Sequence, residues 1–362
     1  MTIRVLHCPT DTGRNAWTLA QAEKKLGLET TVLVYHSTWL NYPNDIDLRT
    51  RELGPFRKAS AIGGLLLRAA RDYDVIHFNG GRSLMPSSPG PFPWLSRADL
   101  AYFRALGKGI VVTYQGCDVR QKSECVRRFD IDACSHCADP CSETFDAHKA
   151  YMVRGFDKYA DAIYSLNPDL MWVLPKRAEF LPYATIDLEE WNPLPPASGE
   201  TFTILHAPTN RGVKGTECII AAVGKLKESH PEVELLLVEN TPHHEVRALY
   251  ERADLVVDQL LLGWYGGFAV EAMALARPVV AYIREQDMVF VPDEMRADIP
   301  VINATPDTIL TVLTGAVEHR DRLAVVGARS RAYVERWHDP MKIAARTKAA
   351  YERILERKGA GR

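Results

Sequence analysis

The sequence predicts two α/β domains, each built on a parallel β-sheet that is covered by helices. The chain has 362 residues, and a domain commonly contains roughly 100 to 200 residues, so two packed units are expected. Short apolar runs rich in β-branched residues alternate with helical patterns in both halves of the chain. This order implies parallel strands joined by helices. A proline-rich stretch separates the two halves.

The first half starts this alternation at its first residues. Its expected strands are residues 3–7, 31–35, 75–78, 110–114 and 163–166, and its expected helices are residues 16–26 and 147–159. A stretch rich in Cys, Asp and Arg interrupts the pattern after Tyr114. Because this stretch directly follows a strand, we interpret it as an insertion at the carboxyl end of that strand.

The proline-rich stretch, EEWNPLPPASGET at residues 189–201, is typical of an interdomain connection. Beyond it, strands are expected at residues 202–207, 233–238, 255–257 and 279–282, and helices at residues 216–229, 244–253 and 268–275. A helical region at 306–358 follows, with a break at His338-Asp339-Pro340, and its last segment is long enough to pack back on the first domain. The expected organisation is two Rossmann-like, doubly wound domains at 1–190 and 201–338, with a cysteine-rich loop at 117–141 in the first, and a C-terminal helix at 339–362.

The composition is that of a globular protein without a strong overall charge. Hydrophobic residues make up 46% and charged residues 25%, and the formal net charge is -2, so no overall field would gather nucleic acid or anionic lipid. The first residues, MTIRVL, are strand-like and lack the pattern of a secretory signal, which favours a cytoplasmic protein. The best apolar window, residues 255–276, is interrupted by Asp258 and Glu271, so an integral membrane protein is not expected.

Two loops with binding character follow strands of the second half. Ligands of open parallel sheets bind beyond the carboxyl ends of the strands. One loop carries Arg211 and Lys214 beside a glycine and opens a helix, which are the parts of a diphosphate-binding site. The other carries Gly266-Gly267, where the backbone can approach a ligand closely. Glu271 would lie about one turn into the next helix, where it can accept hydrogen bonds from a ribose diol.

These loops resemble the donor-binding segments of glycosyltransferase family 4. The resemblance rests on KGT…AAVGKL and GGFAVEAMALARPVVAY, and in the first half on TGRN, DVIHFNGGRSL and GKGIVVTYQGCDVR. It implies a GT-B fold, in which two Rossmann-like domains face a central cleft. It also implies a retaining transfer of a sugar from a nucleotide-diphosphate sugar to a hydroxyl of a saccharide, lipid or small-molecule acceptor.

The same resemblance implies roles for individual residues. Lys214 and Arg211 would stabilise the leaving diphosphate, and Glu271 would bind the ribose. The expected donor-binding residues are Gly13, Thr209, Lys214, Gly266, Gly267 and Glu271, and the expected catalytic residues are Lys214, Arg211, Asn79 and Gln115.

Three features differ from the family pattern. Gly263 stands where the family carries a second glutamate for the hydroxyls of the donor sugar. Asn79 and Gln115 replace histidines, so they can form hydrogen bonds but cannot carry a proton at neutral pH. Arg211 lies two residues after the position expected for the family's arginine, which is Thr209. These differences leave open a non-catalytic nucleotide-sugar-binding or scaffold protein. A nucleotide-sugar epimerase is a weaker alternative, because Asn79, Gln115 and Gly263 do not offer the acid or base groups that epimerisation needs.

The insertion contains a cluster of cysteines. Cys125, Cys134, Cys137 and Cys141 have the spacing C-x8-C-x2-C-x3-C, with Cys117 as an alternate ligand. A C-x2-C turn presents two sulfurs to one ion, which favours a structural zinc site without an open catalytic position. Zinc would hold together a loop that has few apolar residues of its own. A disulfide, an iron–sulfur cluster and unbound thiols are the alternatives.

A histidine and a tryptophan near these loops can each be interpreted as a core residue or as a ligand-binding residue. His206, like the other strand histidines, is expected in the core, although it directly precedes the loop with Arg211. Trp264 precedes the glycine pair, and such a ring can pack in the core or stack on a sugar or a base.

Overall fold

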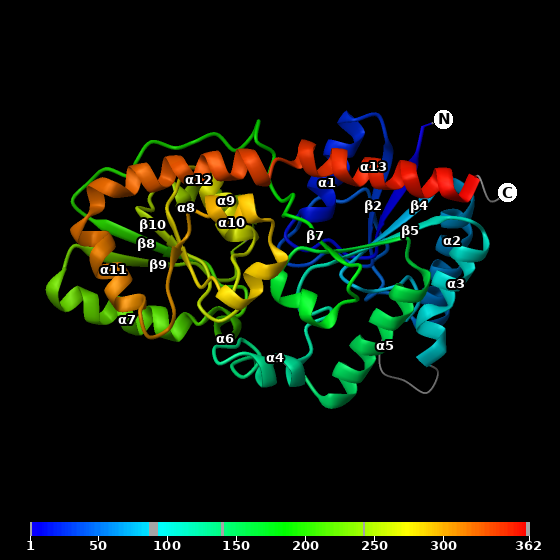
Figure 1. Ribbon diagram of the computed structural model, residues 1–362, viewed down its shortest axis with the longest axis horizontal. Helices are drawn as coiled ribbons and strands as arrows, with labels where there is room; N and C mark the ends of the chain where they lie inside the picture. Colours follow the sequence, from blue (N-terminus) through cyan, green and yellow to red (C-terminus); the bar gives the residue numbers. More distant parts are fainter. Residues whose placement is uncertain (1, 87–92, 139–140, 242, 360–362) are drawn as a thin grey trace. The chain divides into compact units, whose positions relative to one another are not determined.

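The computed structural model describes residues 2–86, 93–138, 141–241 and 243–359. The chain divides into two compact units. The first unit comprises Met1–Glu124, Cys141–Thr185 and Pro340–Arg362, and the second comprises Cys125–Pro140 and Ile186–Asp339. Each unit has its own parallel sheet with helices packed against it (Figure 1).

Within the described residues, the sheet of the first unit has seven strands in the order β3-β2-β1-β4-β5-β6-β7, and every adjacent pair is parallel. The strands are β1 (Arg4–Cys8), β2 (Glu29–Val34), β3 (Ile46–Asp47), β4 (Val75–Asn79), β5 (Gly109–Tyr114), β6 (Ala162–Ser165) and β7 (Glu179–Phe180). All residues of β4 and β5 are buried, as expected for a parallel sheet that is covered on both faces. The strands expected from the sequence are confirmed, and the short β3 and β7 were not predicted.

The helices of the first unit include the two that the sequence predicts. They are α1 (Asn15–Lys25), α2 (Pro55–Asp72), α3 (Ala98–Ala105), α5 (Glu143–Tyr159) and α13 (Pro340–Gly359). The C-terminal helix α13 lies along α1, which confirms that the chain returns to its first domain (Figure 1). The short helix α4 (Lys122–Arg128) crosses the boundary between the two units.

A buried polar network fixes α13 to the first sheet. The Tyr351 hydroxyl lies 2.9 Å from Glu23 Oε1 and 2.6 Å from His77 Nδ1. Thr347 donates to the same Glu23 oxygen at 2.7 Å, and His7 Nε2 lies 2.7 Å from the other one. Burial lowers the pKa of His77 well below its ordinary value, so this ring is neutral. These strand histidines are therefore core residues, as expected from the sequence.

Within the described residues, the sheet of the second unit has five parallel strands in the order β12-β11-β10-β8-β9. They are β8 (Phe202–His206), β9 (Val233–Leu237), β10 (Leu255–Val257), β11 (Val279–Ala281) and β12 (Ile302–Asn303). The helices are α6 (Arg211–Lys214), α7 (Thr216–Ser229), α8 (His243–Tyr250), α9 (Gly267–Ala274), α10 (Asp293–Asp298), α11 (Ile309–Glu318) and α12 (Leu323–Trp337). The predicted strands and the break before Pro340 are confirmed, while a second break between α11 and α12 was not predicted.

The cysteine-rich segment is divided between the units. The sequence places residues 117–141 in the first domain, whereas residues 125–140 are grouped with the second unit. The physical reason is that the Arg284 guanidinium donates to the Ile131 carbonyl at 2.7 Å and packs on the ring of Phe129. Residues 139–140 lie outside the described residues. No helix in the described ranges is long and apolar enough to cross a membrane.

Candidate donor-binding site

Lys214 is positioned by the short helix α6, which follows β8. The Asn210 side chain caps the start of α6 by accepting from the Val213 N–H. Gly215 ends the helix with φ at +75°, a left-handed conformation that glycine adopts without strain. The Lys214 carbonyl accepts from the Leu260 N–H at 3.1 Å, which ties the end of α6 to the loop after β10. This backbone arrangement directs the lysine toward the carboxyl ends of β8 and β10.

The Lys214 ammonium is held by two acceptors that directly follow β10. It donates to Asp258 Oδ1 at 2.7 Å and to Gln259 Oε1 at 2.6 Å. Asp258 also accepts from the Gly266 N–H at 2.6 Å, so one carboxylate connects the two loops that the sequence singled out. An ammonium group has three donors, and the described residues use two of them. With 13% of its side chain exposed, Lys214 can offer the third to a ligand.

The second loop leads into the N-terminus of α9. Gly266 stands at the N-cap, and a Cβ built there would lie 3.4 Å from Lys214 Nζ, so the ammonium and the helix start are adjacent. Gly267 is the first helical residue. A helix N-terminus beside a cation is a favourable place for an anion.

Glu271 lies one turn into α9 and is buried. Its Oε2 accepts a hydrogen bond from the Tyr250 hydroxyl at 2.9 Å. Tyr250 ends α8 and is itself fully buried, so it holds the carboxylate in one orientation. A carboxylate that is held in one orientation can accept hydrogen bonds from a diol.

Arg211 and Thr209 lie on the same loop but at more exposed positions. The Arg211 guanidinium contacts Glu217 and Glu239, each at 3.0 Å. It therefore points toward two carboxylates, and Lys214 is the cation of this loop that lies at the start of α9.

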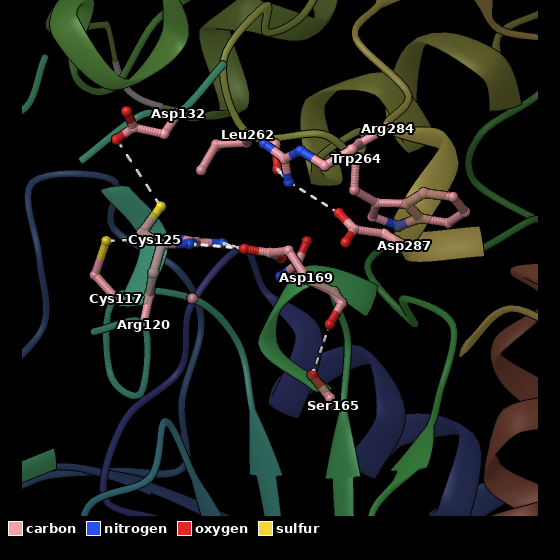
Figure 2. A network of polar contacts seen from close by, with 12 residues as sticks. Cys117, Arg120, Cys125, Asp132, Ser165, Asp169, Leu262, Trp264, Arg284 and Asp287 are labelled. Carbon is pink, nitrogen blue, oxygen red and sulfur yellow. Dashed lines mark hydrogen bonds and ion pairs between the residues drawn. The ribbon is translucent and has the colours of Figure 1, made fainter. Parts of the chain in front are cut away.

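The place of the missing second glutamate is occupied by another side chain. Gly263 has φ at +79°, and a Cβ there would lie 2.4 Å from Nη1 of Arg284. The Arg284 guanidinium pairs with Asp287 at 2.9 Å and also donates to the Leu262 carbonyl at 3.3 Å (Figure 2). The left-handed backbone conformation and the Arg284 guanidinium both disfavour a glutamate at position 263.

The first unit brings together its two candidate residues. Asn79 ends β4 and Gln115 directly follows β5, and the Gln115 amide lies 3.5 Å from Asn79 Oδ1. Asn167 donates to the Gln115 carbonyl at 2.6 Å, which fixes that backbone. Gly13 lies on the loop after β1 with φ at +62°. All three therefore lie at the carboxyl end of the first sheet.

The two residues with open interpretations are both in the core. His206 is fully buried, with Nδ1 2.8 Å from the Val257 carbonyl and Nε2 2.9 Å from the Thr216 hydroxyl. Burial lowers its pKa to about 4. Trp264 is also fully buried and stacks on Tyr265 with the ring centroids 4.3 Å apart. Neither residue is exposed to a ligand.

The cysteines are arranged differently from the expected set of four. The Sγ atoms of Cys125 and Cys134 and a carboxylate oxygen of Asp132 lie within 4.8 Å of one another, and all three residues are buried. In the part of the chain that the structure describes, this grouping does not include Cys137 or Cys141. Cys117 is exposed and belongs to the first unit, where its sulfur accepts from Arg120 at 3.7 Å (Figure 2).

A cavity of about 630 Å³ lies at the opposite end of the second sheet. It is lined by Asp254 and Pro278, which precede β10 and β11, and by several arginines. Two of these are held by protein acceptors, since Arg320 pairs with Asp254 and Arg277 donates to the Tyr250 carbonyl at 2.9 Å. The cavity is thus separate from the residues around Lys214.

No family model and no curated protein matches the sequence. Solved structures, however, match it over nearly its whole length. The match to sucrose-phosphate synthase from Thermosynechococcus elongatus covers 98% of this chain and 100% of the synthase chain, with 15% identity and a TM-score of 0.63. The match to Anabaena HepE in complex with UDP and glucose covers 97% of this chain and 100% of the HepE chain, with 12% identity and a TM-score of 0.61. The match to a glycosyltransferase from Rickettsia africae covers 98% of this chain and 99% of that protein's chain, with 12% identity and a TM-score of 0.60.

The chain has the GT-B fold. At 12 to 15% identity the likeness is one of fold. The two α/β domains expected from the alternation of strands and helices, and the GT-B fold implied by the resemblance, are therefore confirmed.

The residues that hold the two candidate donor loops in place were not predicted from the sequence. Asp258 and Gln259 follow a predicted strand directly, so the rule that ligands gather at strand ends identifies them in retrospect. Tyr250 and Arg284 had no such signal. Their importance arises from contacts with residues far away in the sequence, such as Glu271 and Ile131.

Proposed function

We propose that this protein is a glycosyltransferase that moves a sugar from a nucleotide-diphosphate sugar to a hydroxyl group of a saccharide, lipid or small-molecule acceptor. The observation that carries the proposal is the position of the Lys214 ammonium beside Gly266, at the start of α9. Solved structures of the same fold in complex with UDP and UDP-glucose support a donor of this class.

In this proposal the second unit binds the donor. Lys214 and the N–H groups of the first α9 residues, starting with Gly267, bind the diphosphate, because a cation and a helix N-terminus both favour negative charge, and Gly266 lets the ligand approach the backbone closely. Glu271, oriented by Tyr250, binds the ribose hydroxyls. Thr209 and Arg211 lie at the outer end of the same loop, and a diphosphate would draw the Arg211 guanidinium from its exposed ion pairs with little loss.

We propose that transfer proceeds with retention of configuration, as the resemblance to glycosyltransferase family 4 implies. The acceptor oxygen forms a bond to the anomeric carbon on the face from which the diphosphate leaves, and the acceptor proton passes to the departing phosphate oxygen. No protein nucleophile takes part. Lys214 and the α9 N-terminus stabilise the negative charge that grows on the diphosphate.

We assign the acceptor side to the first unit. Gly13 allows the loop after β1 to approach the substrates, and Asn79 and Gln115 offer amide groups at the carboxyl end of the first sheet. Because amides do not titrate, these two residues orient hydroxyl groups and do not transfer protons.

We also propose that the cysteine-rich segment carries a structural zinc ion. Cys125 and Cys134 supply two thiolates and Asp132 a carboxylate, and all are ligands that zinc accepts. The Asp132 carboxylate accepts from the Ser135 N–H and hydroxyl, each at 2.7 Å, which orients it as outer partners orient a metal ligand. Cys137, in the same C-x2-C pair, and Cys141 remain the candidates for a further ligand.

The function is tested by replacing Lys214. A thermal-shift screen with UDP-, GDP-, ADP- and dTDP-sugars first identifies the donor, since a ligand of the native state raises the melting temperature. With that donor, Lys214→Ala should lower the transfer rate about 100-fold or more, because a preorganised stabilising group is lost. Unchanged turnover would exclude the proposed role.

Two control variants accompany this test. Lys227→Ala removes an exposed cation from α7 in the same unit and should leave transfer unchanged. Lys214→Ala/Asp258→Asn removes both partners of the ion pair, so it leaves no unpaired buried carboxylate. It should show the same loss of transfer as Lys214→Ala at a higher melting temperature.

The occupied space at Gly263 favours one second candidate, a nucleotide-sugar-binding protein without transferase activity. Arg284 lies where the family pattern would carry a carboxylate for the donor sugar. Donor binding with neither transfer to an acceptor panel nor hydrolysis would support that alternative.

A further inference from the structure

One part of the cysteine-rich segment, residues 125–138, packs against the candidate donor loops of the second unit. In α6, a Cβ at Gly212 would lie 2.0 Å from the carbonyl oxygen of His136. Only glycine therefore allows the segment to approach this closely. Gly212 is two residues before Lys214, so the contact is made on the loop that presents the proposed diphosphate ligand.

A second contact is made by Arg284, next to the loop that leads to Gly266. Its guanidinium donates to the Ile131 carbonyl at 2.7 Å and lies 3.8 Å from the centre of the Phe129 ring. On the other side it pairs with Asp287 and reaches the carbonyl of Leu262. Figure 2 shows Arg284 between Leu262 and Asp287. At 5% exposure this side chain is shielded from water, so its hydrogen bonds are strong and specific.

The cluster of Cys125, Asp132 and Cys134 encloses the same part of the segment. Phe129 and Ile131, which Arg284 contacts, lie between Cys125 and Cys134 in the chain. An ion bound by the two thiolates and the carboxylate would close this loop. The ligand atoms lie within 4.8 Å of one another, and a tetrahedral zinc site needs about 4 Å, so a small contraction suffices.

We propose that the cysteine-rich segment, closed by its metal ion, positions the donor loops, so that donor binding depends on the metal and on Arg284. The proposal rests on the donor site assigned under Proposed function. The ion fixes Phe129 and Ile131, Arg284 connects them to the loop before α9, and His136 supports α6 at Gly212. Arg284 is a positioning residue, because its guanidinium is engaged by protein groups.

Hydrogen exchange in nucleotide-free protein tests the structural half of this proposal without a donor. Chelation of the metal, Cys134→Ser and Arg284→Met should each increase exchange in residues 208–216 as well as in residues 125–138. Gly212→Ala should have the same effect, because its methyl group displaces His136. The matched control is Gly224→Ala on α7, where a Cβ has no neighbour within 4 Å. Unchanged exchange at 208–216 in these variants would overturn the proposal.

Metal content and donor kinetics test the functional half. The purified protein should contain zinc, Cys134→Ser should lose it, and Cys218→Ser, a cysteine in α7, should retain it. Arg284→Met should retain zinc but raise KM for the donor about 10-fold or more, with a smaller change in kcat, because it displaces binding loops and not reacting atoms. Arg296→Met, an exposed arginine on α10, is the control.

The double variant Cys134→Ser/Arg284→Met should have a donor KM no higher than that of the more impaired single variant, because both substitutions act through the same segment. Metal-free wild type with an unchanged donor KM would refute the coupling. A protein that binds no nucleotide sugar but shows the predicted exchange changes would refute the proposed function and leave the role of the segment in positioning α6 supported.

Discussion

The Lys214 ammonium is shared between resident acceptors and the ligand that we assign to it. Asp258 and Gln259 fix its position before any ligand arrives, so little side-chain freedom is lost on binding. The same carboxylate holds the Gly266 N–H. Asp258 thus positions both the Lys214 ammonium and the backbone at the start of α9, although its own charge would repel the diphosphate that we propose as the ligand.

His206 should make the stability of the protein pH-dependent. Its folded pKa of about 4 lies below the ordinary value of 6.5, mainly because of burial, with Lys214, Arg211 and Asp258 nearby. Between these pH values the unfolded chain binds more protons, so this contribution to stability is present above pH 6.5 and is lost as the pH falls toward 4. The loss should reach roughly 3 kcal/mol.

Urea unfolding at pH 7.5 and pH 4.5 checks this prediction. His206→Asn should be less stable than wild type at pH 7.5, and this difference should shrink at pH 4.5. The exposed His319→Asn should show no such change. A difference between wild type and His206→Asn that does not vary with pH would show that another group is responsible.

Several site residues could be predicted because their signals are local. Lys214 and Gly266 directly follow strand patterns, and their residue types suit a bound anion. Arg284 could not be predicted, because its main partner in the inserted segment is the Ile131 carbonyl. A backbone carbonyl is present in every residue and gives no signal in the sequence. Asp132 could not be predicted as a ligand either, because the spacing of the cysteines indicates thiolate ligands alone.

Among the elements, α13 is fixed to the first sheet and to α1 by buried hydrogen bonds. Tyr351 links Glu23 on α1 with His77 on β4 through one hydroxyl. Tyr351→Phe removes that hydroxyl and leaves both partners buried with one hydrogen bond fewer. It should lower the free energy of unfolding by about 1 to 3 kcal/mol.

Chemical denaturation measures this effect. Tyr102→Phe on α3 removes a hydroxyl from a partly exposed ring and should change stability by less than about 0.5 kcal/mol. If the two variants were equally stable, the network around Glu23 would not be what fixes α13.

Elements with a long hydrophobic pattern could be predicted, and very short ones could not. The strands at the centre of each sheet are continuous apolar runs, which is why β4 and β5 were found. The edge strands β3 and β7 have two residues each, too few for any periodicity. The grouping of residues 125–140 with the second unit depends on tertiary contacts alone.

At the scale of the whole molecule, the proposed donor site lies in one unit, so the donor should stabilise that unit selectively. At 100 times its dissociation constant, a ligand stabilises the form that binds it by about 2.7 kcal/mol. UDP, if it is the nucleotide identified by the thermal-shift screen, should therefore slow hydrogen exchange in β8 and β10 more than in β4 and β5. Equal or greater protection of the first unit would place the nucleotide elsewhere.

The return of α13 to the first unit has a consequence for biosynthesis. A growing chain leaves the ribosome from its N-terminus, and many N-terminal domains fold while the rest is still being made. Here His77 Nδ1 and Glu23 Oε1 obtain the Tyr351 hydroxyl as a partner only when α13 has emerged. The complete first unit therefore forms only after the whole second unit has been synthesised, and until then the surface of α1 that α13 covers lacks its packing partner.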